Sequence, residues 1–119
     1  MYKDLGAKGA DGGVDGVLEF YRPVFGAKLE TEHAIVQVKG GNVSPDMVRA
    51  TRQVVTDKKV TAGIILCFAD QMTTVENNRS QDTFEDAMGN IYPVIQGFSI
   101  EDMLSGKIPN LPFVKPSKK

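Results

Sequence analysis

The sequence predicts an α/β domain with a mixed central β-sheet flanked by helices. Apolar runs typical of strands surround one well-capped helical segment, in the order strand, strand, helix, strand. A strand, helix, strand order implies a right-handed parallel crossover, and antiparallel pairing of the first two runs makes the sheet mixed. The 119 residues fit one domain, which we expect over residues 1–108, followed by a Pro- and Lys-rich tail over residues 109–119.

Two strands are expected in the first third of the chain. A glycine-rich turn over residues 11–16 overlaps the start of the first apolar run, which extends from Val14 to Phe20. The second run extends from Ala34 to Lys39 and is followed by Gly40. Antiparallel pairing of these runs would bring the start of the first beside the end of the second.

The first helix has the clearest start in the chain. Ser44 suits the N-cap, Pro45 the first helical position and Asp46 the positive end of the helix dipole. Apolar residues then recur at helical spacing, and we expect the helix to run to about Lys58 and to pack on the sheet.

Four further elements are expected after this helix. Residues Thr61 to Phe68 form an apolar run typical of a central strand, and the polar stretch from Thr73 to Met88 is predicted as a second helix ending at Gly89. Residues Tyr92 to Ser99 are predicted as one strand. Ser99 then caps a short helix through Leu104, which Gly106 ends.

Composition limits the classes of protein that fit. A single cysteine, Cys67, excludes an intrachain disulfide and suits a reducing cytoplasm, which is the expected location. The sequence has no apolar stretch long enough to span a bilayer. The formal net charge of −1 differs from the strongly basic footprint of a dedicated nucleic-acid binder, so any DNA affinity must come from local clusters.

Polar side chains gather at one end of the two predicted strands. Side chains alternate along a strand, so Gln37 and Lys39 point to one face, and antiparallel pairing places Asp15 near the same end. The Asp15 carboxylate, the Gln37 amide oxygen and the Val38 carbonyl are oxygen ligands of the kind that Mg²⁺ or Mn²⁺ prefers. Lys39 would orient a water or stabilise negative charge. This pattern suggests metal-dependent phosphodiester cleavage.

Simpler interpretations of the same residues remain open. Asp11-Gly12-Gly13 is also an ordinary turn sequence, because glycine reaches positive φ and aspartate satisfies local backbone donors. Lys39 at a strand end can be a solvated charge, or a charge that discourages edge-to-edge pairing.

The combination of motifs resembles a known family. The segment Gly12-Gly13-Val14-Asp15-Gly16 and the segment Gln37-Val38-Lys39-Gly40-Gly41 resemble the PD-(D/E)xK nuclease superfamily, in its Mrr-like restriction endonuclease branch, where glutamine replaces the usual acid. These stretches and residues 100–112 are also similar to the nuclease-like C-terminal domain of some prokaryotic and phage DNA methyltransferases. The resemblance implies a restriction-endonuclease-like fold and a DNA endonuclease. It assigns Asp15 as the metal-binding aspartate, Gln37 as the variant second ligand and Lys39 as the catalytic lysine.

Two departures from the family pattern suggest alternatives: an upstream glutamate is missing, and the glutamine at position 37 removes one negative charge from the metal site. Many such nucleases carry a glutamate on a helix before the aspartate motif, where this chain offers only Asp4. A second copy in a homodimer, or a partner chain, would then supply that glutamate. The other alternative is a noncatalytic DNA-binding or interaction module associated with a DNA methyltransferase or restriction-modification system.

Contacts to DNA are expected around the start of the first helix. Gly40 and Gly41 would let a phosphate approach the backbone and the helix N-terminus at Ser44, while Arg49 and Arg52 would offer cations. Each of these residues also fits an ordinary turn, cap or solvated helix face. Further basic candidates are Lys58, Lys59, Arg79, Lys115, Lys118 and Lys119.

Overall fold

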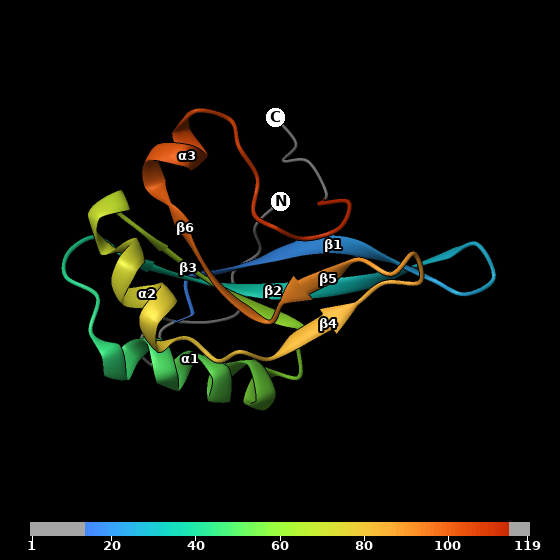
Figure 1. Cartoon of the computed structure of the whole chain (residues 1–119), viewed down its shortest axis with the longest axis horizontal. Coiled ribbons are helices and arrows are strands. Elements are labelled where there is room, and N and C mark those ends of the chain that lie inside the picture. Colours follow the sequence, from blue (N-terminus) through green and yellow to red (C-terminus); the bar gives the residue numbers. More distant parts are fainter. Residues whose placement is uncertain (1–13, 115–119) are drawn as a thin grey trace.

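The computed structural model describes residues 14–114, which form a mixed four-stranded sheet flanked by helices (Figure 1). The strand order is β1 (Gly16–Val24), β2 (Lys28–Lys39), β3 (Ala62–Cys67) and β6 (Ile95–Ser99). Strand β1 is antiparallel to β2, whereas β2, β3 and β6 are mutually parallel. The predicted α/β class and mixed sheet are therefore confirmed.

Some predicted features lie outside the described residues. They are the turn residues 11–13, Asp4, and the tail lysines Lys115, Lys118 and Lys119. Within residues 14–114, no helix is long and apolar enough to cross a membrane.

Helices α1 (Pro45–Lys58) and α2 (Met72–Asn78) cover one face of the sheet (Figure 1). Their inward side chains, such as the fully buried Val48 and Val75, pack in one cluster with Ile35, Ile65 and Ile95 of the sheet. This burial of apolar surface is the main force that holds the helices on the strands. The helix face is also the face on which the odd-numbered residues of β2 lie.

The opposite face of the sheet is covered by the C-terminal part of the described chain. Phe20, Val36 and Ile64 form a second cluster there with the buried Leu111. Helix α3 (Ile100–Leu104) leads into the segment that crosses this face, and Ile100 packs against the same cluster. Residues 110–114 thus pack on the sheet although they lack regular structure.

The sequence signals at the ends of α1 are confirmed. The Ser44 hydroxyl accepts a hydrogen bond from the Met47 backbone N–H at 3.1 Å, and Lys59 ends the helix with φ at 58°. A close approach between α1 and the sheet depends on Gly63, since a Cβ there would lie 2.9 Å from Val55 Cγ2. Only glycine allows this separation without a shift of the helix.

The predicted helix over residues 73–88 is wrong beyond residue 78. Helix α2 follows the short 3₁₀ turn η1 (Ala69–Gln71) and ends at Asn78. The chain then forms a two-stranded ribbon of β4 (Thr83–Glu85) and β5 (Ile91–Pro93). Cross-strand stacking of Phe84 on Tyr92, with ring centroids 5.3 Å apart, favours the ribbon over a polar helix without an apolar stripe.

The single strand predicted over Tyr92–Ser99 is also wrong, because the chain changes sheets at Val94. Residues before it pair with β4, whereas residues after it pair with β3. The first two strands are longer than predicted and meet in a turn in which Gly26 has a φ of 89°. The distal part of β2 is mostly exposed on both faces. It therefore lacks the alternation of apolar and polar residues by which a strand is predicted from sequence.

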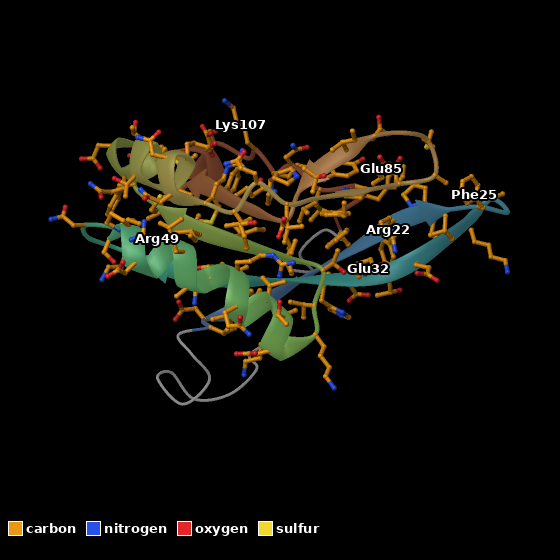
Figure 2. The ribbon with its side chains drawn as sticks, turned by 60° about the horizontal axis from the view of Figure 1, so that its bottom comes forward. Arg22, Phe25, Glu32, Arg49, Glu85 and Lys107 are labelled. Atoms are coloured by element: carbon orange, nitrogen blue, oxygen red, sulfur yellow. The ribbon has the colours of Figure 1, made fainter. Side chains whose placement is uncertain are left out.

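The β4–β5 ribbon is attached to the distal part of the β1–β2 hairpin (Figure 2). Arg22 contacts the Glu32 carboxylate at 2.8 Å and donates a hydrogen bond to the Glu85 carbonyl at 3.3 Å. The Ala87 N–H donates to the Pro23 carbonyl at 2.9 Å. Arg22 therefore joins three strands through one guanidinium group.

The turn of the ribbon is organised around the buried Asp86 carboxylate. It accepts hydrogen bonds from the Met88 and Asn90 backbone N–H groups, the Asn90 side chain and the Tyr92 hydroxyl. Burial acts to raise the pKa of Asp86, but the hydrogen bonds from Asn90, Tyr92 and Met88 outweigh it and hold the pKa below its ordinary value.

We expect Asp86→Asn to destabilise the protein at neutral pH and to have a diminishing effect in acid. Because the folded-state pKa is depressed, ionised Asp86 contributes stability above its unfolded pKa, and this contribution is lost as the pH falls through the folded pKa. Urea unfolding of both proteins from about pH 7 to about pH 2.5 would measure this. A stability difference as large at about pH 2.5 as at about pH 7 would contradict the role of ionisation.

Candidate active site

The carboxyl ends of the three parallel strands meet at one edge of the sheet. Lys39 of β2 is in register with Cys67 of β3, which is in register with Ser99 of β6. Strand β1 runs the opposite way and begins at this edge, so Asp15 immediately precedes its first residue. Ligands of open α/β sheets bind outside the carboxyl ends of the strands. The fold thus brings Asp15, Gln37 and Lys39 to one edge, as the alternation of side chains predicted.

Asp15 is held beside the last residues of β2. Its Oδ2 accepts a hydrogen bond from the Val38 N–H at 2.7 Å, and its own N–H donates to the Val36 carbonyl at 2.8 Å. The carboxylate therefore lies beside the backbone that joins Gln37 to Lys39.

Gln37 is the buried member of the group, with 6% of its surface exposed. Its Oε1 accepts a hydrogen bond from the hydroxyl of Thr51 on α1 at 2.7 Å. The helical spacing of the sequence left open whether Ala50 or Thr51 lies in the inward stripe of the helix. The contact of Thr51 with Gln37 had no signal in the linear pattern, because it depends on the packing of α1.

Lys39 is exposed at the end of β2, and the Val38 side chain on the opposite face is 48% exposed. Within residues 14–114, no carboxylate lies within 4.0 Å of the Lys39 ammonium. The cation is therefore available to a ligand without first breaking an ion pair in the described structure.

Two further carboxylates lie at this edge and were missed by the sequence analysis. Glu101, at the start of α3, accepts a hydrogen bond from the Ala69 N–H at 3.0 Å. Burial raises the pKa of the Cys67 thiol, and the nearby charges of Glu101 and Asp70 raise it further. Glu101 and Asp70 each follow closely on a parallel strand. That position in the sequence was the only feature that could have predicted them as residues of this edge.

The loop after Lys39 is attached to the neighbouring elements by Gln71. The Gln71 Oε1 accepts a hydrogen bond from the Val43 N–H at 2.8 Å. Gly40 and Gly41 lie in this loop, are exposed, and have open space where a Cβ would stand. The backbone there is accessible to a large ligand such as a nucleic acid.

The predicted DNA-contacting side chains on α1 are engaged with acids. Arg49 pairs with Asp46 at 2.6 Å, and Arg52 pairs with Asp82 at 2.7 Å. Hydrogen bonds from Arg52 and Ser80 hold the pKa of Asp82 below its ordinary value. The Ser44 hydroxyl serves as the N-cap. These exposed pairs contribute little stability and leave the helix surface close to neutral.

The donor chemistry of the site suits a hydrated divalent cation. Asp15 provides one carboxylate, and Gln37 provides an amide oxygen, the neutral oxygen donor of the set. In the part of the chain from 14 to 114, no three His, Cys, Asp or Glu side chains group closely enough to hold a metal by themselves. Mg²⁺ tolerates such a set, because it commonly keeps several waters and uses one or two carboxylates.

Comparison with known proteins identifies the family. Residues 2–91 match the Mrr_cat family model, which is described as a restriction endonuclease. The chain belongs to this restriction endonuclease family. The matched part of the restriction endonuclease domain contains Asp15, Gln37 and Lys39, helices α1 and α2, and the β4 strand. No curated protein and no solved structure matches the chain.

Proposed function

We propose that this domain hydrolyses phosphodiester bonds of DNA with the help of Mg²⁺ or Mn²⁺. The observation that carries the proposal is the convergence of Asp15, Gln37 and Lys39 at the carboxyl edge of the sheet, in a chain of the restriction endonuclease family. An acid, a neutral oxygen ligand and an available ammonium are the groups that this hydrolysis needs.

Each residue has a separate task in the proposed reaction. Asp15 would hold the cation as its anionic ligand, with the Gln37 amide oxygen and the Val38 carbonyl as neutral ligands. A divalent cation bound there would polarise the phosphoryl group and lower the pKa of the attacking water. Lys39 places its charge where negative charge builds up on the phosphate oxygens, and it orients the water.

The loop after β2 is proposed to receive the DNA backbone. Gly40 and Gly41 are exposed and carry no side chain that would keep a phosphate from the backbone or from the start of α1 at Ser44. Arg49 and Arg52 lie further along the same helix and would exchange their exposed carboxylate partners for phosphates.

The test is cleavage of supercoiled plasmid by the wild type and by Asp15→Asn, with Mg²⁺, Mn²⁺ or EDTA. Asparagine keeps an acceptor for the Val38 N–H but removes the negative charge, so folding is retained while the cation is lost. We expect metal-dependent nicking by the wild type and a loss of at least about 100-fold in the variant. Equal cleavage by the two proteins, or cleavage in EDTA, would contradict the proposal.

A noncatalytic DNA-binding module is the second candidate. The neutral Gln37 favours it, because a site with one carboxylate attracts a cation less strongly than a site with two. Stoichiometric DNA binding without turnover would support this candidate, and cleavage at catalytic protein concentrations would exclude it. Both candidate functions are compatible with assembly with a second copy or with a DNA methyltransferase. Measurement of the molecular mass in solution tests the homodimer.

A further inference from the structure

We infer that Thr51 on α1 is a positioning residue that fixes the carboxamide of Gln37 and thereby strengthens cation binding at the carboxyl edge of the sheet. The inference rests on the proposed metal site and deepens it by assigning the residue that organises the neutral ligand. Thr51 would touch neither cation nor DNA; it acts through Gln37.

The contact between the two side chains is buried. Thr51 has no exposed surface, and 6% of Gln37 is exposed. The distance from Thr51 Oγ1 to Gln37 Oε1 is 2.7 Å, which is typical of a good hydroxyl hydrogen bond. Polar groups buried in this way require partners, so the pair has little freedom to rearrange.

A carboxamide needs such a contact more than a carboxylate does. One end of the Gln37 amide is an acceptor oxygen and the other is a donor NH₂ group, so a half-turn of the amide exchanges them. Only the oxygen can ligate a cation. A hydroxyl proton given to the oxygen favours one of the two orientations, and an amide oxygen can accept more than one partner.

The hydroxyl is itself shared between two acceptors. Thr51 Oγ1 lies 2.9 Å from the Met47 carbonyl one turn earlier in the helix, in addition to 2.7 Å from Gln37 Oε1. A hydroxyl has one proton to donate, and the bond to the previous turn is the common alternative in helices. The Gln37 oxygen is the nearer of the two acceptors, and the inference assigns the hydroxyl proton to it.

The close packing of α1 makes this contact feasible. Gly63 on β3 lies beneath the helix, and a Cβ at that position would be 3.2 Å from Thr51 Cγ2. Gly63 is the register partner of Ile35, two residues before Gln37 on β2. The missing side chain lets α1 approach the sheet, which brings the Thr51 hydroxyl within reach of Gln37.

The first test compares Mn²⁺ binding by the wild type, Thr51→Val and Thr56→Val, measured by electron paramagnetic resonance without DNA. Valine keeps the shape of threonine and removes only the hydroxyl, and Thr56 is the matched control because its hydroxyl lies on the exposed side of the same helix. We expect about tenfold weaker binding for Thr51→Val, since partners of metal ligands typically contribute 10- to 100-fold. Thr56→Val should bind like the wild type.

A second comparison separates orientation from general packing. In a Gln37→Glu background both ends of the side chain are oxygens, so Thr51→Val should weaken Mn²⁺ binding clearly less than in the wild-type background. If Thr51→Val does not fold, Thr51→Ser against Thr51→Ala replaces it, because both lose the methyl group and only serine keeps the hydroxyl. Equal affinities in that pair would overturn the inference.

The outcomes distinguish this inference from the proposed function. Mn²⁺ binding that weakens in Thr51→Val, in a protein that cuts no DNA, would support the inference and overturn the nuclease proposal. Cleavage by the wild type with unchanged or tighter Mn²⁺ binding in Thr51→Val would overturn the inference alone. If the wild type binds no Mn²⁺, both are wrong.

Discussion

Lys39→Ala is expected to lower the rate of DNA cleavage by about 1,000-fold, since one group that stabilises transition-state charge typically contributes about 100- to 1,000-fold. The residue is exposed at the carboxyl edge of the sheet, one position beyond the N–H group that binds Asp15. Its ammonium has no carboxylate partner in the described part of the chain, so its charge is available to the substrate.

Single-turnover cleavage with saturating metal and excess protein would measure this effect, because it separates the chemical step from DNA binding. Lys28→Ala is the matched control: Lys28 starts the same strand at its opposite end, far from the carboxyl edge. We expect the control to cut at the wild-type rate. If Lys39→Ala cut as fast as Lys28→Ala, the assigned role of Lys39 would be wrong, and the site would require another cation.

Phe20→Ala is expected to reduce the free energy of unfolding by about 3–5 kcal/mol, because the fully buried ring leaves a large cavity. The ring lies in the apolar cluster on the face opposite α1, with its centroid 5.9 Å from that of Phe84. Its backbone also bridges to Val114. Phe20 thus joins the main sheet, the β4–β5 ribbon and the C-terminal segment in one core.

Urea unfolding followed by circular dichroism would measure the loss, and Phe25→Ala provides the control. Phe25 lies at the tip of the β1–β2 hairpin and is 87% exposed (Figure 2). Its removal should change stability by less than about 0.5 kcal/mol. A loss at Phe20 as small as that at Phe25 would show that the described C-terminal segment and ribbon do not share a core with the sheet.

Much of the candidate site could be predicted because its rules are local. The two-residue period of a strand places Gln37 and Lys39 on one face, and antiparallel pairing brings Asp15 to the same end. The cap residues of α1 likewise predicted the start of the helix that covers this face. These predictions needed only the sequence and the geometry of a single element or a single pair of strands.

The errors occurred where side-chain contacts and packing outweigh the periodic pattern of the sequence. The polar residues after Asn78 have no periodicity that predicts a ribbon. Their conformation depends on the stacking of Phe84 on Tyr92 and on the hydrogen bonds that Asp86 receives. The role of the chain after Gly106 was similarly hidden, since burial of Leu111 depends on the far face of the sheet.

The sequence by itself determined the α/β class, the helix from Pro45 to Lys58, and the meeting of Asp15, Gln37 and Lys39 at one end of two strands. Only the tertiary structure showed that α1 brings Thr51 to Gln37, and that the carboxylates of Asp70 in η1 and Glu101 in α3 lie at the same edge. The physical reason is the distance along the sequence over which each effect acts. Periodicity and capping act over a few residues, whereas side-chain contacts across a sheet depend on register and packing that no short segment encodes.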